Sequence, residues 1–309
     1  MLIPTGFKQC SLTTSLGDLV YYTADPQFWL LNPQSLPSET LIFLHGFGGG
    51  SSAYEWSKVY PTFASEYRIL APDLLGWGRS THLDRPYRLD DYLTTIAEFL
   101  EQACPSPATL IASSLTAAIL LRLLAERPEL ATQVCKALFL VAPSGLSDFG
   151  EDYTKTPIAQ IVSTPGLDRL LYGGVASEIG IRSFLEIRQF ARRDRVLPEI
   201  ISAYLASAQQ PNADYSALSF IRGDLCLDVA DYVSKLATPT AILWGQKSSF
   251  TKPEIGERLA ELNPAAIRSC QILEDVGLTP QLEVPEITTG LLRRFLNSLE
   301  AASRNTPLH

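Results

Sequence analysis

Histidine is scarce in this chain, with three residues among 309: His45, His82 and His309. Any chemistry that relies on an imidazole therefore has few side chains to draw on. The five cysteines are odd in number and widely spaced, and no Cys-x-x-Cys pair occurs. This spacing argues against a metal site and against a disulfide framework, and it predicts small buried thiols in a reducing compartment. We expect no metal or other cofactor.

Long apolar segments and a leader sequence are also missing. The longest apolar runs, such as residues 117–125 and 137–142, are far shorter than a membrane span. The start MLIPTGFKQC has no charged segment followed by an apolar one, so we expect no signal peptide and a soluble, cytoplasmic protein. The net charge of −8 disfavours nucleic acid as a partner, because an acidic surface repels phosphates.

Short apolar runs alternate with helical periodicity along most of the chain. The runs suit strands that are buried on both faces, and the alternation predicts an α/β fold with a mostly parallel sheet and helices on both faces. The predicted strands are residues 8–14, 18–23, 40–44, 67–71, 108–112, 135–141, 240–244 and 269–273, and the predicted helices are residues 90–102, 115–126, 253–262 and 286–299.

The pattern changes in the middle of the chain. Residues 145–236 contain no convincing buried strand, and apolar residues recur at helical spacing through residues 179–190 and 197–206. We therefore expect residues 1–144 and 237–309 to form the α/β core. Residues 145–236 would be a helical insertion within the same structural domain.

Two glycine-containing segments follow predicted strands. In His45-Gly-Phe-Gly-Gly-Gly50, the glycines let the backbone turn sharply and direct N–H groups toward a ligand oxygen. In Asp73-Leu-Leu-Gly-Trp-Gly-Arg-Ser80, the glycines indicate a tight connection. We expect Asp73 and Arg79 to form a salt bridge or to cap local backbone, rather than to act in catalysis.

A third segment, Ala112-Ser-Ser-Leu-Thr116, lies between a predicted strand and an apolar helix. A nucleophile elbow reads small-x-Ser-x-small, and this register selects Ser114, because the flanks of Ser113 would be bulky. Thr116 is larger than the usual glycine. An alternative is that Ser113 and Ser114 merely cap the following helix.

Together the three segments resemble the α/β-hydrolase superfamily, in the branch of cofactor-free serine hydrolases with a helical cap, and the resemblance extends over residues 41–299. It implies that Ser114 occupies the nucleophile position and that the N–H groups of Phe47 and Leu115 form an oxyanion hole. His45 and Gly46 would belong to the oxyanion loop. Residues 145–236 would be the cap, which encloses a substrate pocket with the core.

The chain departs from that family at two positions. In Trp244-Gly-Gln-Lys-Ser248, Ser248 stands where the family has its acid. In the segment from Gly277 to Pro285, Leu278 stands where the family has its histidine. The flanking residues match the family in both segments, so a shifted alignment does not explain the losses. We interpret the triad as degenerate.

Other residues are weak replacements for the missing groups. We expect His45 to hold its loop, His82 to be a solvated loop residue and His309 to lie at a disordered end. Asp148 or Asp152 is a conceivable displaced acid, but an acid without a histidine to orient has little to do in a serine mechanism.

The sequence leaves three functional hypotheses. The first is a hydrolase homologue that binds a small, apolar ligand with little serine-hydrolase activity, since loss of the histidine alone costs about 10⁶-fold in turnover in one serine protease. The second is a genuine ester, thioester or C–C hydrolase, or a lyase, in which Ser114 uses a non-standard proton acceptor. The third is a purely structural or assembly role. The oligomeric state is left open.

Overall fold

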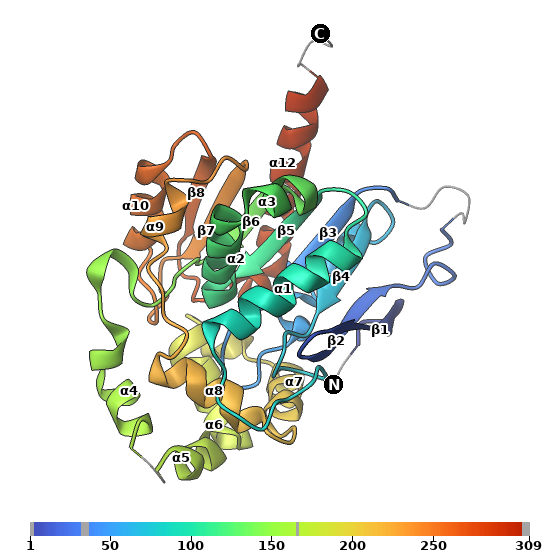
Figure 1. The fold of residues 1–309 in the computed structure, drawn as a ribbon. Helices are drawn as coiled ribbons and strands as arrows, with labels where there is room; N and C mark the ends of the chain where they lie inside the picture. The colour runs from blue at the N-terminus through green and yellow to red at the C-terminus, as the bar shows by residue number, and fades with distance from the viewer. Residues whose placement is uncertain (1–2, 32–36, 165–166, 305–309) are drawn as a thin grey trace.

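Eight strands form one sheet in the order β1-β2-β4-β3-β5-β6-β7-β8 (Figure 1). The computed structural model describes residues 3–31, 37–164 and 167–304, so His309 lies outside the described residues. The strands are β1 Phe7–Thr14, β2 Gly17–Ala24, β3 Thr40–Leu44, β4 Arg68–Pro72, β5 Ala108–Ser113, β6 Cys135–Val141, β7 Thr240–Gly245 and β8 Ile267–Leu273.

The sheet is parallel from β4 to β8, and an antiparallel hairpin of β1 and β2 extends its β4 edge. Every residue of β3, β5 and β7 is buried, which explains why these strands consist of uninterrupted apolar runs. The predicted α/β fold is therefore confirmed, and each predicted strand lies within two residues of an observed one.

Helices cover both faces of the sheet. In Figure 1, α1, α2 and α3 lie in front of the sheet and α12 lies behind it. Helix α3 was not predicted, although Pro128 at its first position is a common start signal. The core helices are α1 Leu89–Ala103, α2 Ser114–Glu126, α3 Pro128–Val134, α10 Glu254–Leu262, α11 Pro280–Glu283 and α12 Pro285–Arg304, with short 3₁₀ turns at Ala53–Trp56 and Tyr60–Phe63.

Residues 145–236, called the insert below, contain helices and no strand in their described part, apart from one isolated bridge between Leu146 and Leu227. The predicted helical stretch 179–190 is interrupted, because α6 ends at Phe184 and a π-helical turn, Leu185–Gln189, follows. The other helices are α4 Pro157–Val162, α5 Leu167–Val175, α6 Glu178–Phe184, α7 Pro198–Ala208, α8 Ala213–Arg222 and α9 Ala230–Val233, with 3₁₀ turns at Asp148–Gly150, Tyr153–Lys155 and Arg193–Arg195.

Buried hydroxyl groups attach the insert to loops at the carboxyl ends of β3 and β4. The Ser207 hydroxyl of α7 donates to the carbonyl oxygen of Ser51 and accepts from the N–H of Gly78, both at 3.0 Å. In α8, the Ser216 hydroxyl donates to the carbonyl oxygen of Gly76 at 2.7 Å. These bonds satisfy loop backbone groups that would otherwise be buried without partners, and they hold the insert over that end of the sheet.

The five cysteines are all free thiols. Only Cys104 and Cys135 are fully buried, so the expectation of buried thiols holds for these two and is wrong for the other three, which are partly exposed. No helix in the described part of the chain is both long and apolar enough to cross a lipid bilayer.

Candidate active site

Ser114 stands at the sharp turn between β5 and α2. Its φ is +53°, in the left-handed region, whereas Ser113 is extended with φ −122° and ψ 150°. Ser113 makes no side-chain cap to α2, so the alternative in which it caps this helix lacks its hydrogen bond. A left-handed conformation is unfavourable for a residue with a side chain, and such strain is concentrated at functional sites.

The glycine loop presses directly against this turn. A Cβ atom added to Gly46 would lie 3.1 Å from Ser113 Oγ and 3.2 Å from Ser114 Cβ, so only glycine fits comfortably. The hydroxyl of Thr116 donates to the carbonyl oxygen of His45 at 2.6 Å. Thr116 is larger than the residue usually found at this elbow position, and this hydrogen bond explains its presence, because it connects α2 to the glycine loop.

The two N–H groups assigned to an oxyanion hole lie in this loop and in α2. Leu115 is in the first turn of α2, where backbone N–H groups have no partner within the helix. Phe47 is held by its ring, which packs against Trp77 at 5.2 Å and Tyr92 at 4.8 Å between centroids.

His45 is fully buried, and both of its ring nitrogens are engaged. Nδ1 donates to the carbonyl oxygen of Gly46 at 2.7 Å, and Nε2 accepts from the N–H of Leu74 at 3.0 Å. Burial lowers the pKa of His45 to about 4, so the ring is neutral at physiological pH. His45 therefore holds the loop and has no free nitrogen for Ser114.

His82 is half-buried, which corrects the expectation of a solvated side chain. Its Nδ1 donates to the carbonyl oxygen of Ser80 at 2.8 Å, while its buried Nε2 has no hydrogen-bond partner among the described residues. The neighbouring Thr81 exchanges two hydrogen bonds with Asp18 near the start of β2, which holds this loop against the β1–β2 hairpin. Within the described residues, neither His82 nor His45 makes a hydrogen bond to Ser114.

Ser248 and Leu278 lie where the strand pattern places them, after β7 and β8. The Ser248 hydroxyl is buried and lies 3.5 Å from the hydroxyl of Thr251. Leu278 is 6% exposed and packs in the main hydrophobic core. Its N–H donates to the carbonyl oxygen of Gln189 at 2.7 Å, so the segment is fastened to the π-helical turn of the insert.

The two aspartates considered as displaced acids have their carboxylates engaged in structural hydrogen bonds. Asp148 is buried, and its carboxylate accepts hydrogen bonds from the Ser144 hydroxyl at 2.5 Å and from the N–H of Val229 at 3.1 Å. Burial raises the pKa of Asp148. Asp152 is exposed and accepts from the N–H of Thr154 at 3.1 Å.

Asp73 and Arg79 have the structural role that the sequence suggested. The Asp73 carboxylate accepts from the N–H groups of Ala53 at 2.8 Å and Arg79 at 2.9 Å, and from the Tyr22 hydroxyl at 3.1 Å. It therefore binds backbone N–H groups in two segments, the 3₁₀ turn that begins at Ala53 and the glycine-containing connection itself. Burial raises the pKa of Asp73 to about 6.

The sequence analysis missed Glu55, a fully buried carboxylate beneath the glycine loop. It accepts from the N–H of Gly46 at 3.0 Å and from three hydroxyls: Ser51 at 2.6 Å, Tyr204 at 3.2 Å and Ser113 at 3.5 Å. Burial raises the pKa of Glu55, because desolvation penalises the charged form. The sequence feature that could have indicated Glu55 is the single acidic residue in Ala53-Tyr-Glu-Trp56, which follows the glycine loop.

A serine at a left-handed strand–helix turn, packed against a glycine loop on a mostly parallel sheet, defines the nucleophile-elbow class of α/β proteins. The alpha/beta hydrolase family model matches residues 41–289. The chain belongs to this family.

Known relatives differ in the chemistry that their names state. Lipase 3 of Moraxella sp. (strain TA144) is 25% identical over 295 residues, which cover 94% of this chain and 85% of the lipase. A haloalkane dehalogenase of Bradyrhizobium diazoefficiens is 24% identical over 256 residues, covering 75% of this chain and 78% of the dehalogenase. The crystal structure of a putative lipase from Acinetobacter baumannii AYE superimposes with a TM-score of 0.73 at 21% identity, covering 96% and 93% of the two chains. This last likeness concerns the fold alone.

The strain at the elbow makes a first prediction. Ser114→Gly should raise the free energy of unfolding by about 1 kcal/mol relative to Ser114→Ala, because glycine adopts a positive φ without a side-chain clash. Both substitutions remove the hydroxyl, so the difference between their free energies of unfolding reports the backbone strain at position 114. Urea unfolding of the two variants measures it, and equal stabilities would contradict the strain at Ser114.

The burial of His45 makes a second prediction. Its pKa is about 4 in the folded chain against about 6.5 in the unfolded chain, so the unfolded state binds more protons between these values. Stability linked to His45 should be intact above pH 6.5, and about 3 kcal/mol of it should be lost as the pH falls to 4. His45→Gln should lack this dependence. An NMR titration of the His45 ring with a midpoint near 6.5 would refute the assignment.

Proposed function

We propose that this protein binds a small, apolar ligand between the core and the insert, which serves as a cap, and that it has little or no ordinary serine-hydrolase activity. The observation that carries the proposal is the surroundings of the Ser114 hydroxyl. In the described part of the chain, no hydrogen bond reaches this hydroxyl. The sequence resemblance, in which Leu278 stands where the family has its histidine, points the same way.

The argument rests on proton transfer. A serine hydroxyl is a poor nucleophile at neutral pH unless a neighbouring base removes its proton. His45 has no free nitrogen, and Ser248 cannot orient an imidazole in the way a carboxylate does. N–H groups at Phe47 and Leu115 would still polarise a bound carbonyl, which supports binding more than turnover.

Aromatic side chains from both parts of the molecule support an apolar ligand. The ring of Phe47 in the glycine loop lies 5.9 Å from that of Phe220 in α8, which stacks on Phe250 at 5.8 Å. The insert packs closely against the glycine loop, because a Cβ atom added to Gly48 would lie 3.3 Å from Nε2 of Gln189.

Restoring the missing groups tests the proposal. The double variant Ser248→Asp/Leu278→His should hydrolyse short p-nitrophenyl esters at least about 100-fold faster than the wild-type chain, because it supplies an acid and a base to an elbow that is already formed. Release of p-nitrophenol, measured at pH 8 on folded protein, gives the rates.

Three controls accompany this measurement. Ser114→Ala in the double variant should return the rate to that of wild type, and each single substitution should give less than the pair. Efficient, Ser114-dependent hydrolysis by the wild-type chain would contradict the proposal, since that chain would then possess a working proton acceptor.

The Ser113–Glu55 contact favours a second candidate function. Glu55 is a buried carboxylate whose pKa is raised, and its Oε2 lies 3.5 Å from Ser113 Oγ at the elbow. In this arrangement Glu55 would accept the proton of Ser113, and Ser113 would in turn accept the proton that leaves Ser114. The protein would then be a hydrolase of an ester, thioester or C–C bond, or a lyase, with a carboxylate in place of the imidazole.

Glu55→Gln distinguishes the two candidates. If the chain has Ser114-dependent activity, this substitution should lower kcat by about 10²-fold or more, with the larger loss at the pH where Glu55 is ionised. Asp148→Asn is the matched control, because it neutralises another buried carboxylate that makes no hydrogen bond to the elbow. Ser114-dependent turnover that survives Glu55→Gln would exclude Glu55 as the acceptor.

A further inference from the structure

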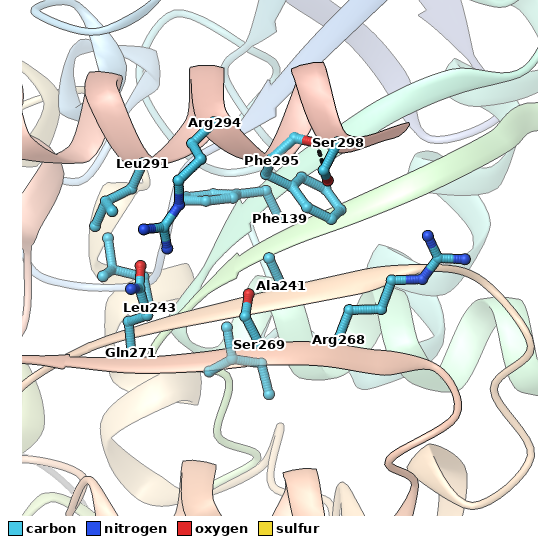
Figure 2. A pocket seen from close by; sticks show the side chains of 11 residues that line it. Phe139, Ala241, Leu243, Arg268, Ser269, Gln271, Leu291, Arg294, Phe295 and Ser298 are labelled. Carbon is cyan, nitrogen blue, oxygen red and sulfur yellow. Dashed lines mark hydrogen bonds between the residues drawn. The ribbon is translucent and has the colours of Figure 1, made fainter. Parts of the chain in front are cut away.

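A hollow of about 300 Å³ lies between α12 and the face of the sheet formed by β6, β7 and β8 (Figure 2). None of the residues that line it belongs to the Ser114 site. Its volume is at the lower end of the range for small-molecule pockets.

The hollow arises from a decrease in side-chain size across three neighbouring strands. Phe139 in β6 pairs with Ala241 in β7, which pairs with Ser269 in β8. Helix α12 packs onto the first member of this row, since the ring of Phe295 lies 6.1 Å from that of Phe139. Ala241 and Ser269 are too small to reach the helix, so a space remains beside it.

Two arginines provide the only ionisable side chains of this lining. Arg294 projects from α12 into the space between helix and sheet, and Arg268 lies along β8 toward the other end of the hollow (Figure 2). Neither guanidinium group makes a hydrogen bond or an ion pair to a described residue. By contrast, the adjacent Arg293 pairs with Glu66 at 2.8 Å. Both arginines are exposed, and they border an apolar floor that includes Leu243, Leu291 and Phe295.

We propose that this hollow binds a small organic anion that carries a short apolar chain, such as a medium-chain carboxylate. Arginine presents paired donors that match a carboxylate, so Arg294 would hold the charged end. Leu243, Leu291 and Phe295 would contact the apolar chain. The site is independent of the function proposed for Ser114.

Calorimetric titration of the full chain with sodium octanoate tests this site. Saturable binding is expected, and Arg294→Gln should weaken it at least 10-fold, whereas Arg293→Gln, one residue along the same helix, should leave the affinity unchanged. Ser269→Phe, which fills the hollow from the partly exposed end of the row, should also abolish binding while leaving the melting temperature of the chain within a few degrees.

Other outcomes would overturn the proposal. Octan-1-ol that binds as tightly as octanoate would show that the arginines do not select for charge, and inorganic phosphate that binds as tightly would show that the apolar floor contributes nothing. Octanoate binding that survives both Arg294→Gln and Ser269→Phe would place the ligand elsewhere, including between core and insert. Absence of binding at millimolar octanoate would also reject the site.

Discussion

The close contact between the glycine loop and the turn at Ser114 is the constraint on which the rest of the site depends. Strand β5, helix α2 and the loop after β3 meet where a side chain on Gly46 would touch both elbow serines. The chain accepts a left-handed Ser114 there and secures the junction with the bond from Thr116 to the His45 carbonyl. His45 has no ring nitrogen left to act as a base, because both nitrogens are hydrogen-bonded to backbone groups in the same junction.

The electrostatics of this junction also oppose the chemistry for which such an elbow is built. An oxyanion hole stabilises negative charge that develops on a substrate oxygen. Here Glu55 lies beneath the same loop, bonded to the N–H of Gly46 and to the Tyr204 hydroxyl of the insert. When ionised, it would place a negative charge beneath the loop that carries the Phe47 N–H, one of the two groups that the resemblance assigns to an oxyanion hole. Its raised pKa reduces this conflict by favouring the neutral acid.

Sequence reasoning succeeded where the determining interactions are local. Uninterrupted apolar runs predicted the parallel strands, and the small flanks in Ala112-Ser-Ser-Leu-Thr116 selected Ser114, the serine that has the positive φ. The interpretation of Ser248 and Leu278 as substituted triad positions also rests on short segments with recognisable neighbours, and it stays a prediction.

The features that were missed depend on partners far along the chain. Buried Glu55 accepts a hydrogen bond from Tyr204, 149 residues away, and no local sequence pattern around Glu55 predicts that contact. The π-helical turn Leu185–Gln189 breaks a stretch whose periodicity is helical throughout, since the Gln189 carbonyl must meet the N–H of Leu278 from the core. The burial of His82 follows from the packing of its loop against the β1–β2 turn, which a linear pattern does not reveal.

The measurement that tests the central claim most directly is the rate at which a fluorophosphonate probe modifies Ser114, followed by mass spectrometry of the intact chain. This probe reacts with a serine whose proton has an acceptor and is nearly inert toward an unactivated hydroxyl. We expect labelling of Ser114 no faster than that of the other serines of the chain. Labelling confined to Ser114, at a rate typical of an active esterase, would contradict it.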